Sequence, residues 1–213
     1  MNKNRYELLG SLLNEWKAKR QEYKIFCEDG ILIEDEWANA NPKVMFLLKE
    51  TYRHFHIIRG EKGPEGTSNT FWRRMRMWTF IITEIFNDRT PDFASAIEIK
   101  EEPNRCIAYV NIKKHAERIE YNNEAYSVDE DIKKYAINDK DYLRRQIDII
   151  NPDIIVCCST FKFCPYIFNE IEPISERLFK TGNKWLIDFE HPSQRRTYES
   201  NFNDLSNISR KLK

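Results

Sequence analysis

The sequence predicts an α/β fold in which a parallel sheet is covered by helices on both faces. Four short, largely apolar runs are typical of strands buried on both faces. Segments with helical spacing lie between the runs, and strands that alternate with helices favour a parallel sheet. The chain has 213 residues, of which 41% are hydrophobic and 13% aromatic. This length and composition suit one domain with a sizeable core and exclude a disordered chain.

The elements can be placed in order along the chain. Residues 6–26 begin with apolar residues at helical spacing, and the acidic segment 28–36 predicts a solvated loop or cap. The strands are expected at 44–48, 106–110, 154–158 and 185–189. Helices are expected at 71–86, 139–150 and 198–212, whereas the polar residues 115–138 indicate an irregular surface excursion. The single domain comprises an N-terminal extension (1–42), a core (43–196) and a C-terminal helix (197–213).

Charge and cysteine content exclude some classes of protein. The 34 basic and 34 acidic residues cancel, which argues against a histone-like binder but leaves a local basic cleft open. None of the five cysteines forms a C-x2-C pair, which argues against a zinc ribbon or a redox motif. Their odd number, with Cys157 and Cys158 adjacent inside an apolar run, favours a reduced intracellular compartment. No signal segment and no apolar run of 18 residues is present. We therefore expect a cytoplasmic protein without a membrane partner.

The residues that follow the strands are the candidates for function, because ligands of open α/β sheets bind beyond the carboxyl ends of the strands. Glu50 follows the first run, Asn111 the second and His191 the fourth. All four histidines lie near such strand exits. A carboxylate and imidazoles on neighbouring loops are suited to acid–base or electrostatic catalysis. A metal site is less favoured, because no tight ligand spacing such as H-E-x-x-H occurs.

Basic and aromatic residues also gather at these exits. Residues 53–76 hold six basic and two acidic side chains, a local excess of 6 − 2 = +4, with aromatic residues interleaved. Further basic residues follow the other strands: Lys113, Lys114, Arg195 and Arg196. A basic rim with aromatic rings suits a phosphodiester backbone and a stacked base. A solubilising surface over ordinary core aromatics explains the pattern equally well.

Five segments resemble motifs of the uracil-DNA glycosylase superfamily, in the same order along the chain. They cover roughly residues 43–196 and are Leu48-Lys49-Glu50-Thr51-Tyr52, Gly66-Thr67-Ser68-Asn69-Thr70-Phe71-Trp72-Arg73, Tyr109-Val110-Asn111-Ile112-Lys113-Lys114, the segment YLRRQIDIINPDIIVCCS at 142–159, and His191-Pro192-Ser193. The second segment is similar to the Gly-Asn-x-Phe-Trp helix start of the thymine-DNA glycosylase branch. The resemblance implies a three-layer α/β/α sandwich with a four-stranded, largely parallel central sheet.

The resemblance also implies an activity: excision of uracil or a related damaged base from DNA by hydrolysis of the N-glycosidic bond, with the base flipped out of the duplex. DNA would be the partner, and neither a cofactor nor a metal is implied. Glu50 would position water and His191 would stabilise charge on the leaving base. The other implied roles are base contacts by Tyr52, Phe71 and Asn111, and DNA-backbone contacts by Ser193, Arg195, Arg196 and Lys113.

Two other functions stay open. Leu48 stands where the family has a small glycine, and Thr51 where it has a proline. These departures favour a member of the same fold with altered or lost catalysis, acting as a nucleic-acid- or protein-binding module. A hydrolase or transferase for a small nucleotide or other anion is less favoured, because the chain has no G-x-x-x-x-G-K-[ST] phosphate loop.

Overall fold

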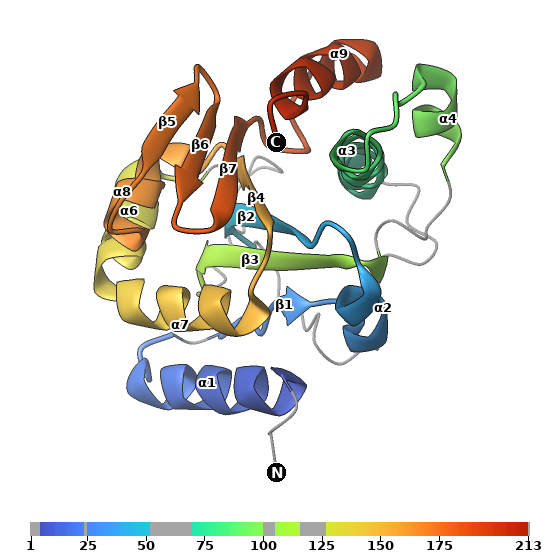
Figure 1. The fold of residues 1–213 in the computed structure, drawn as a ribbon. Coiled ribbons are helices and arrows are strands. Elements are labelled where there is room, and N and C mark those ends of the chain that lie inside the picture. Colours follow the sequence, from blue (N-terminus) through green and yellow to red (C-terminus); the bar gives the residue numbers. More distant parts are fainter. Residues whose placement is uncertain (1–4, 24, 52–69, 100–104, 116–126, 213) are drawn as a thin grey trace.

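The four predicted strands form the centre of the sheet. The computed structural model describes residues 5–23, 25–51, 70–99, 105–115 and 127–212 (Figure 1). The strands are β2 (Val44–Glu50), β3 (Ile107–Lys113), β4 (Ile154–Cys158) and β7 (Lys184–Phe189). They lie side by side in the order β3-β2-β4-β7, and each neighbouring pair is parallel. The α/β class and the position of each predicted strand are confirmed.

The expectation of a four-stranded sheet is wrong, because the sheet is mixed and has seven strands in the order β1-β3-β2-β4-β7-β6-β5. β1 (Gly30–Ile31) pairs antiparallel with β3 at one edge. The hairpin of β5 (Glu172–Ser175) and β6 (Leu178–Thr181) extends the other edge antiparallel to β7. β1 is two residues long, and three of the four β5 residues are exposed. Neither strand therefore carries the apolar run that marks a central strand.

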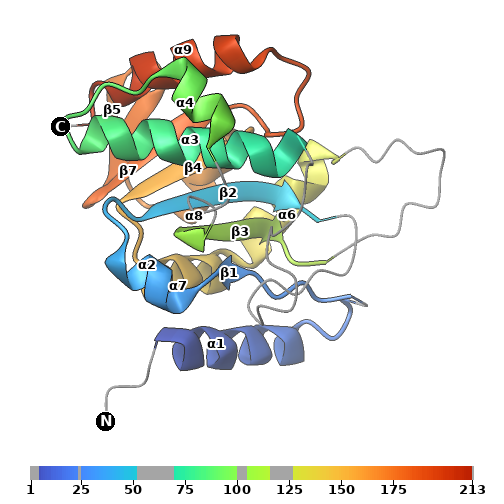
Figure 2. The same ribbon diagram turned by 90° about the vertical axis from the view of Figure 1, so that its right-hand side faces the viewer.

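Three helices of the described part of the chain, among them the C-terminal one, cover one face of the sheet. They are α3 (Thr70–Phe86), α4 (Phe93–Glu98) and α9 (Tyr198–Ser209), and α3 packs against α9 (Figure 2). Trp78 of α3 meets Phe46 of β2 and Phe189 of β7 in the core of this face. α3 begins one residue before the predicted range 71–86 and ends with it; its apolar residues recur every three or four positions, which made the helix predictable.

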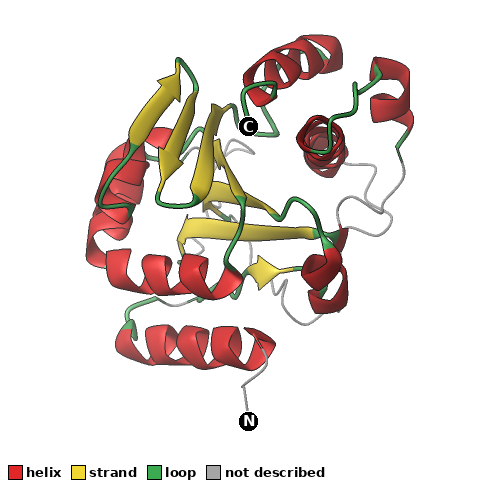
Figure 3. Cartoon of the chain, in the orientation of Figure 1, coloured by secondary structure: helices red, strands yellow, loops and turns green. Residues whose placement is uncertain are grey.

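The other face is covered by α1 (Arg5–Lys19), α6 (Asp129–Asn138), α7 (Lys140–Ile150) and α8 (Cys164–Ile167), with the short 3-10 helix Phe161–Phe163 before α8 (Figure 3). Trp37 of α2 (Glu34–Asn39) belongs to the core of the same face. The prediction of an irregular excursion at 115–138 is wrong for residues 129–138, which form α6; residues 116–126 lie outside the described part. Ile132 and Ala136 are the only fully buried positions of α6, a pattern too sparse to reveal the helix.

Within the described part of the chain, no helix has the length and apolar character that crossing a membrane requires.

Candidate functional site

The ends of the four parallel strands meet at one edge of the sheet, which we call the rim. Glu50 at the end of β2 pairs in register with Lys113 at the end of β3. On the other side of β2, Cys158 at the end of β4 pairs with Phe189 at the end of β7, two residues before His191. Because parallel strands end at the same edge, Glu50, Lys113 and His191 come from different strands to one rim. This convergence, expected from the sequence, places the candidate residues on one side of the molecule.

His191 is held as a neutral imidazole with a defined tautomer. Its Nδ1 accepts a hydrogen bond from the Ser193 backbone N–H at 3.2 Å. Burial of the ring, together with the positive charge of Lys49, lowers the pKa of His191 from 6.5 to about 4. A neutral imidazole whose Nδ1 accepts a hydrogen bond carries its proton on Nε2. The Phe71 ring at the start of α3 lies 5.8 Å from the imidazole, centroid to centroid. The site therefore contains a neutral N–H donor beside an aromatic ring.

Arg74 fixes the loop that carries His191. Its side chain is buried, and its guanidinium donates to the backbone carbonyls of Pro192 at 2.8 Å, of Arg196 at 2.5 Å, and of Gln194. One planar cation thus joins three carbonyls of a single turn, a role that suits the rigid fork of five N–H donors on an arginine. The sequence counted Arg74 toward the basic rim, but the structure places its charge inside the protein, where it positions the loop after β7.

Glu50 and Lys113 form a buried ion pair. Lys113 Nζ lies 3.1 Å from Glu50 Oε2, and the two side chains are 2% and 5% exposed. The ammonium also lies 5.1 Å from the centre of the Tyr135 ring of α6. The carboxylate predicted to position water is thus shared with a lysine, and the lysine predicted to meet the DNA backbone is buried. Removal of either partner would leave an unbalanced buried charge.

Asn111 belongs to a buried polar cluster centred on Asp29. The Asp29 carboxylate accepts hydrogen bonds from the Asn111 backbone N–H at 2.8 Å and from its side-chain Nδ2 at 3.0 Å. Lys114 and Gln146 donate to the other carboxylate oxygen, at 2.5 Å and 3.0 Å. The side-chain oxygen of Asn111 is buried and has no hydrogen-bond partner among the described residues. Asp29 therefore fixes the orientation of the Asn111 amide, whose oxygen remains buried.

The prediction that the acidic segment is solvated is wrong for Asp29, which is 1% exposed. The reason is the ammonium of Lys114, which is itself buried beside Asp29. Burial lowers the pKa of Lys114, and the charge of Asp29 opposes that shift. Two opposite charges can be buried together where neither could be buried alone. A charge run in the sequence does not reveal this, because the partner lies 85 residues along the chain.

The predicted DNA-backbone residues fall into three groups. Ser193 and Arg195 are exposed, and the described part of the chain gives Arg195 no ion-pair partner. Arg196 is engaged with Glu190 at 2.5 Å and Asp204 at 2.6 Å. Lys113 is buried, as described above. Of the four residues, Ser193 and Arg195 are the two that lie on the surface without such ties.

Tyr52, predicted to line the base pocket, lies outside the described residues, as do Arg53, His54 and His56. Three residues that sequence reasoning missed are now part of the site's support: Asp29, Arg74 and Gln146. In the sequence, Asp29 belongs to the acidic segment, Arg74 to the basic stretch 53–76 and Gln146 to the predicted helix 139–150. None of these carries a sequence signal of burial, so only the fold identifies them.

The fold and the rim define an α/β protein with polar side chains gathered beyond the ends of its parallel strands, where such sheets bind ligands. No protein-family model and no curated protein matches the chain. Across the residues that the structure describes, no group of three or more His, Cys, Asp or Glu side chains is arranged to hold a metal ion.

Proposed function

We propose that the chain is a DNA-base glycosylase that flips uracil or a related damaged base out of the duplex and hydrolyses its N-glycosidic bond. The observation that carries the proposal is the neutral His191 beside Phe71 at the rim. When the bond between the sugar C1′ and the base nitrogen breaks, its electron pair moves into the base. The N–H on Nε2 would stabilise the negative charge that develops on a base oxygen. Because the imidazole is neutral, it would not form an ion pair with a carboxylate or phosphate before the reaction.

Other residues at the rim support a base-binding role. The resemblance assigns Asn111 to the polar edge of the base, and its unpartnered, buried oxygen is suited to accept a ring N–H. Phe71 offers a ring on which a flipped base can stack. Ser193 and Arg195 lie on the exposed surface of the same loop as His191, where a phosphate of the flipped nucleotide can be held.

Base release tests this proposal directly. Single- and double-stranded oligonucleotides with uracil, hypoxanthine, xanthine or a mismatched thymine are incubated with the wild type, His191→Gln and Asn111→Ala. We expect release by the wild type and a loss of about 100-fold or more in both variants, the size of effect that removal of one transition-state donor causes. His115→Gln is the matched control, since it makes the same substitution at another strand exit. Each variant is checked for folding by urea unfolding.

The second candidate is a binding module of the same fold, and the Glu50–Lys113 pair favours it. A carboxylate 3.1 Å from a buried ammonium is less free to orient water than an unpaired one. This function predicts DNA binding that weakens with salt and no release of any base. Wild-type protein that is folded, binds DNA and releases nothing from the panel would replace the glycosylase proposal with this one.

A further inference from the structure

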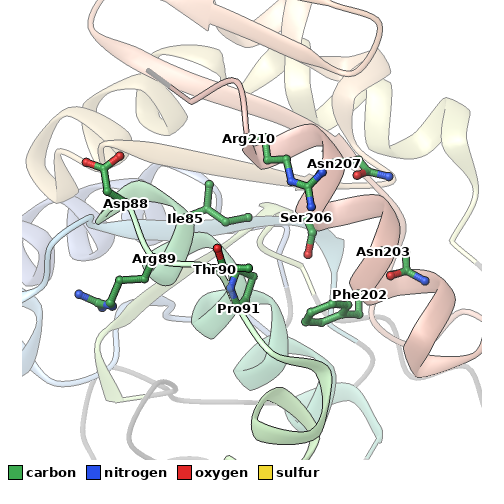
Figure 4. A pocket seen from close by; sticks show the side chains of 10 residues that line it. All are labelled: Ile85, Asp88, Arg89, Thr90, Pro91, Phe202, Asn203, Ser206, Asn207 and Arg210. Atoms are coloured by element: carbon green, nitrogen blue, oxygen red, sulfur yellow. The ribbon is translucent and has the colours of Figure 1, made fainter.

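A second candidate site lies at the other end of α3. A cavity of about 400 Å³ opens between the end of α3, the turn that follows it and the second half of α9 (Figure 4). α3 starts at the rim with Phe71 and reaches the cavity with Ile85, and the rise of the helix between these two residues is about 21 Å. None of the residues described at the rim lines this cavity.

One part of the cavity wall is apolar. Ile85 and Phe202 are 8% and 9% exposed, and Pro91 completes this part of the wall. The Phe202 ring is fixed by an edge contact with Phe93, with the ring centroids 5.3 Å apart. A rigid apolar wall in a cavity of this size suits the body of a small organic molecule.

Ser206 contributes a buried hydroxyl that lacks a partner. The residue is 5% exposed, and its Oγ has no hydrogen-bond partner among the described residues. A helical serine commonly satisfies its hydroxyl on the carbonyl four residues earlier, and Ser206 does not. Figure 4 shows its side chain turned toward the space between α9 and the turn after α3. Because buried hydroxyls are normally hydrogen-bonded, this one is suited to a ligand atom in the cavity.

The charge of the cavity is uneven. Arg210 lies one turn after Ser206, is exposed, and has no ion-pair partner in the part of the chain that the structure describes. Arg89 also lines the cavity, but Glu84 neutralises it through hydrogen bonds of 2.6 to 3.0 Å. In Figure 4 the carboxylate of Asp88 points away from Arg210, whose guanidinium is directed toward Ser206. One positive charge is therefore left beside the unpartnered hydroxyl.

We propose that this cavity binds a small organic anion with one carboxylate or phosphate group and an apolar body. The anionic group would accept hydrogen bonds from Arg210 and Ser206, and the body would lie against Ile85, Pro91 and Phe202. The guanidinium matches the geometry of either oxyanion. This site is independent of base excision at the rim, so it stands whether or not the rim is catalytic.

NMR titration of the full ¹⁵N-labelled chain tests the site. Benzoate and phenyl phosphate are the anionic probes, and comparing them identifies the preferred head group. Benzyl alcohol lacks the charge and inorganic phosphate lacks the apolar body. We expect saturable shifts for the amides of 85–91 and 202–210 with at least one anionic probe. Absence of such shifts overturns the proposal. The proposal is also overturned if benzoate binds no better than benzyl alcohol and phenyl phosphate binds no better than inorganic phosphate.

Variants separate binding from folding. Arg210→Gln is expected to weaken the better anionic probe about tenfold, because it removes a charge-assisted contact. Ser206→Ala is expected to weaken binding without lowering the melting temperature, because the wild-type hydroxyl makes no hydrogen bond that folding needs. Arg89→Gln is the matched control, since its cation is already neutralised, and affinity should stay within twofold. Unchanged affinity in Arg210→Gln contradicts the proposal.

Discussion

His191 illustrates how one ring can be tuned by its surroundings. A histidine on the surface would be partly protonated near neutral pH, and an imidazolium would attract the carboxylates and phosphates around it. Burial and the nearby Lys49 instead hold His191 neutral, and the Ser193 N–H sets which nitrogen carries the proton. The ring can then donate from Nε2 over the whole physiological pH range.

The lowered pKa of His191 predicts a pH-dependent stability. The folded protein binds the proton at a pKa of about 4, and the unfolded chain at about 6.5. The stabilisation is therefore complete above pH 6.5 and is lost as the pH falls toward 4, by at most about 3 kcal/mol. Urea unfolding at pH 7.5 and 4.5 should show that His191→Gln loses this part of the pH dependence. An imidazole titration near pH 6.5 in the folded wild type, followed by NMR, would contradict the prediction.

Asp29 gives a second prediction at the scale of one residue. Asp29→Asn keeps the shape but leaves the Lys114 ammonium buried without its counter-charge. We expect the free energy of unfolding to fall by about 3–5 kcal/mol. Asp35→Asn, in the same acidic segment but exposed, should change it by less than about 0.5 kcal/mol. Equal effects of the two substitutions in urea unfolding would show that the buried ion pair between Asp29 and Lys114 does not stabilise the fold.

At the scale of elements, α3 contributes two side chains to the rim and so holds the loop that carries His191. Its first turn supplies Phe71, and its second supplies Arg74, which holds the loop after β7. Thr197 at the start of α9 caps that helix by accepting a hydrogen bond from the Ser200 N–H at 3.1 Å. The loop 190–197 is therefore fixed at its middle by α3 and at its end by α9, which gives His191 a defined place without a regular element of its own.

Arg74 is expected to act as a positioning residue for His191. Arg74→Met removes the three hydrogen bonds to the loop, so the loop should loosen and hydrate the imidazole. We expect the pKa of His191 to rise toward 6.5 and base release to fall, with Arg74→Lys between the wild type and Arg74→Met. Arg73→Met is the control, because Arg73 is exposed and lies over the Tyr198 ring. A folded Arg74→Met protein whose His191 still titrates near 4 would show that Arg74 does not position the ring.

At the scale of the whole molecule, the net charge of zero means that no long-range field draws DNA to the protein. The affinity for DNA that we propose would then come from a few cations near the rim. Arg195 is exposed there, whereas Arg196 is tied to Glu190 and Asp204. The two neighbouring arginines are therefore expected to differ in role although the sequence presents them as a pair.

Arg195→Gln should weaken DNA binding and reduce the slope of log affinity against log salt by about one, because it removes one phosphate contact. Arg196→Gln should instead lower the free energy of unfolding by about 1–2 kcal/mol, since Glu190 and Asp204 lose the closer of their two cations and keep only Arg177 at 3.5 Å. Fluorescence anisotropy at several salt concentrations and urea unfolding separate the two effects. Equal loss of DNA affinity in both variants would contradict this assignment.

The sequence predicted the parts of the fold that carry a strong periodic signal. The central strands were placed because each is apolar on both faces, and α3 because Met75, Trp78 and Ile82 share one face. The hairpin at the sheet edge and α6 were missed because few of their positions are buried: none in β5, one in β6 and two in α6. The convergence of Glu50 and His191 followed from topology. The burial of Lys113 and Asp29 did not, because it depends on partners that only the folded chain brings together.

The edge strand β5 has a consequence for behaviour at high concentration. It carries the exposed Ile174, 45% accessible, on a strand that neighbouring molecules could otherwise extend. Pro173 removes a backbone donor, and the register shifts between Pro173 and Ser175. A short strand with a proline and a bulge is a poor template for sheet-to-sheet aggregation. The outermost strand thus presents an apolar side chain to solvent while its backbone discourages polymerisation.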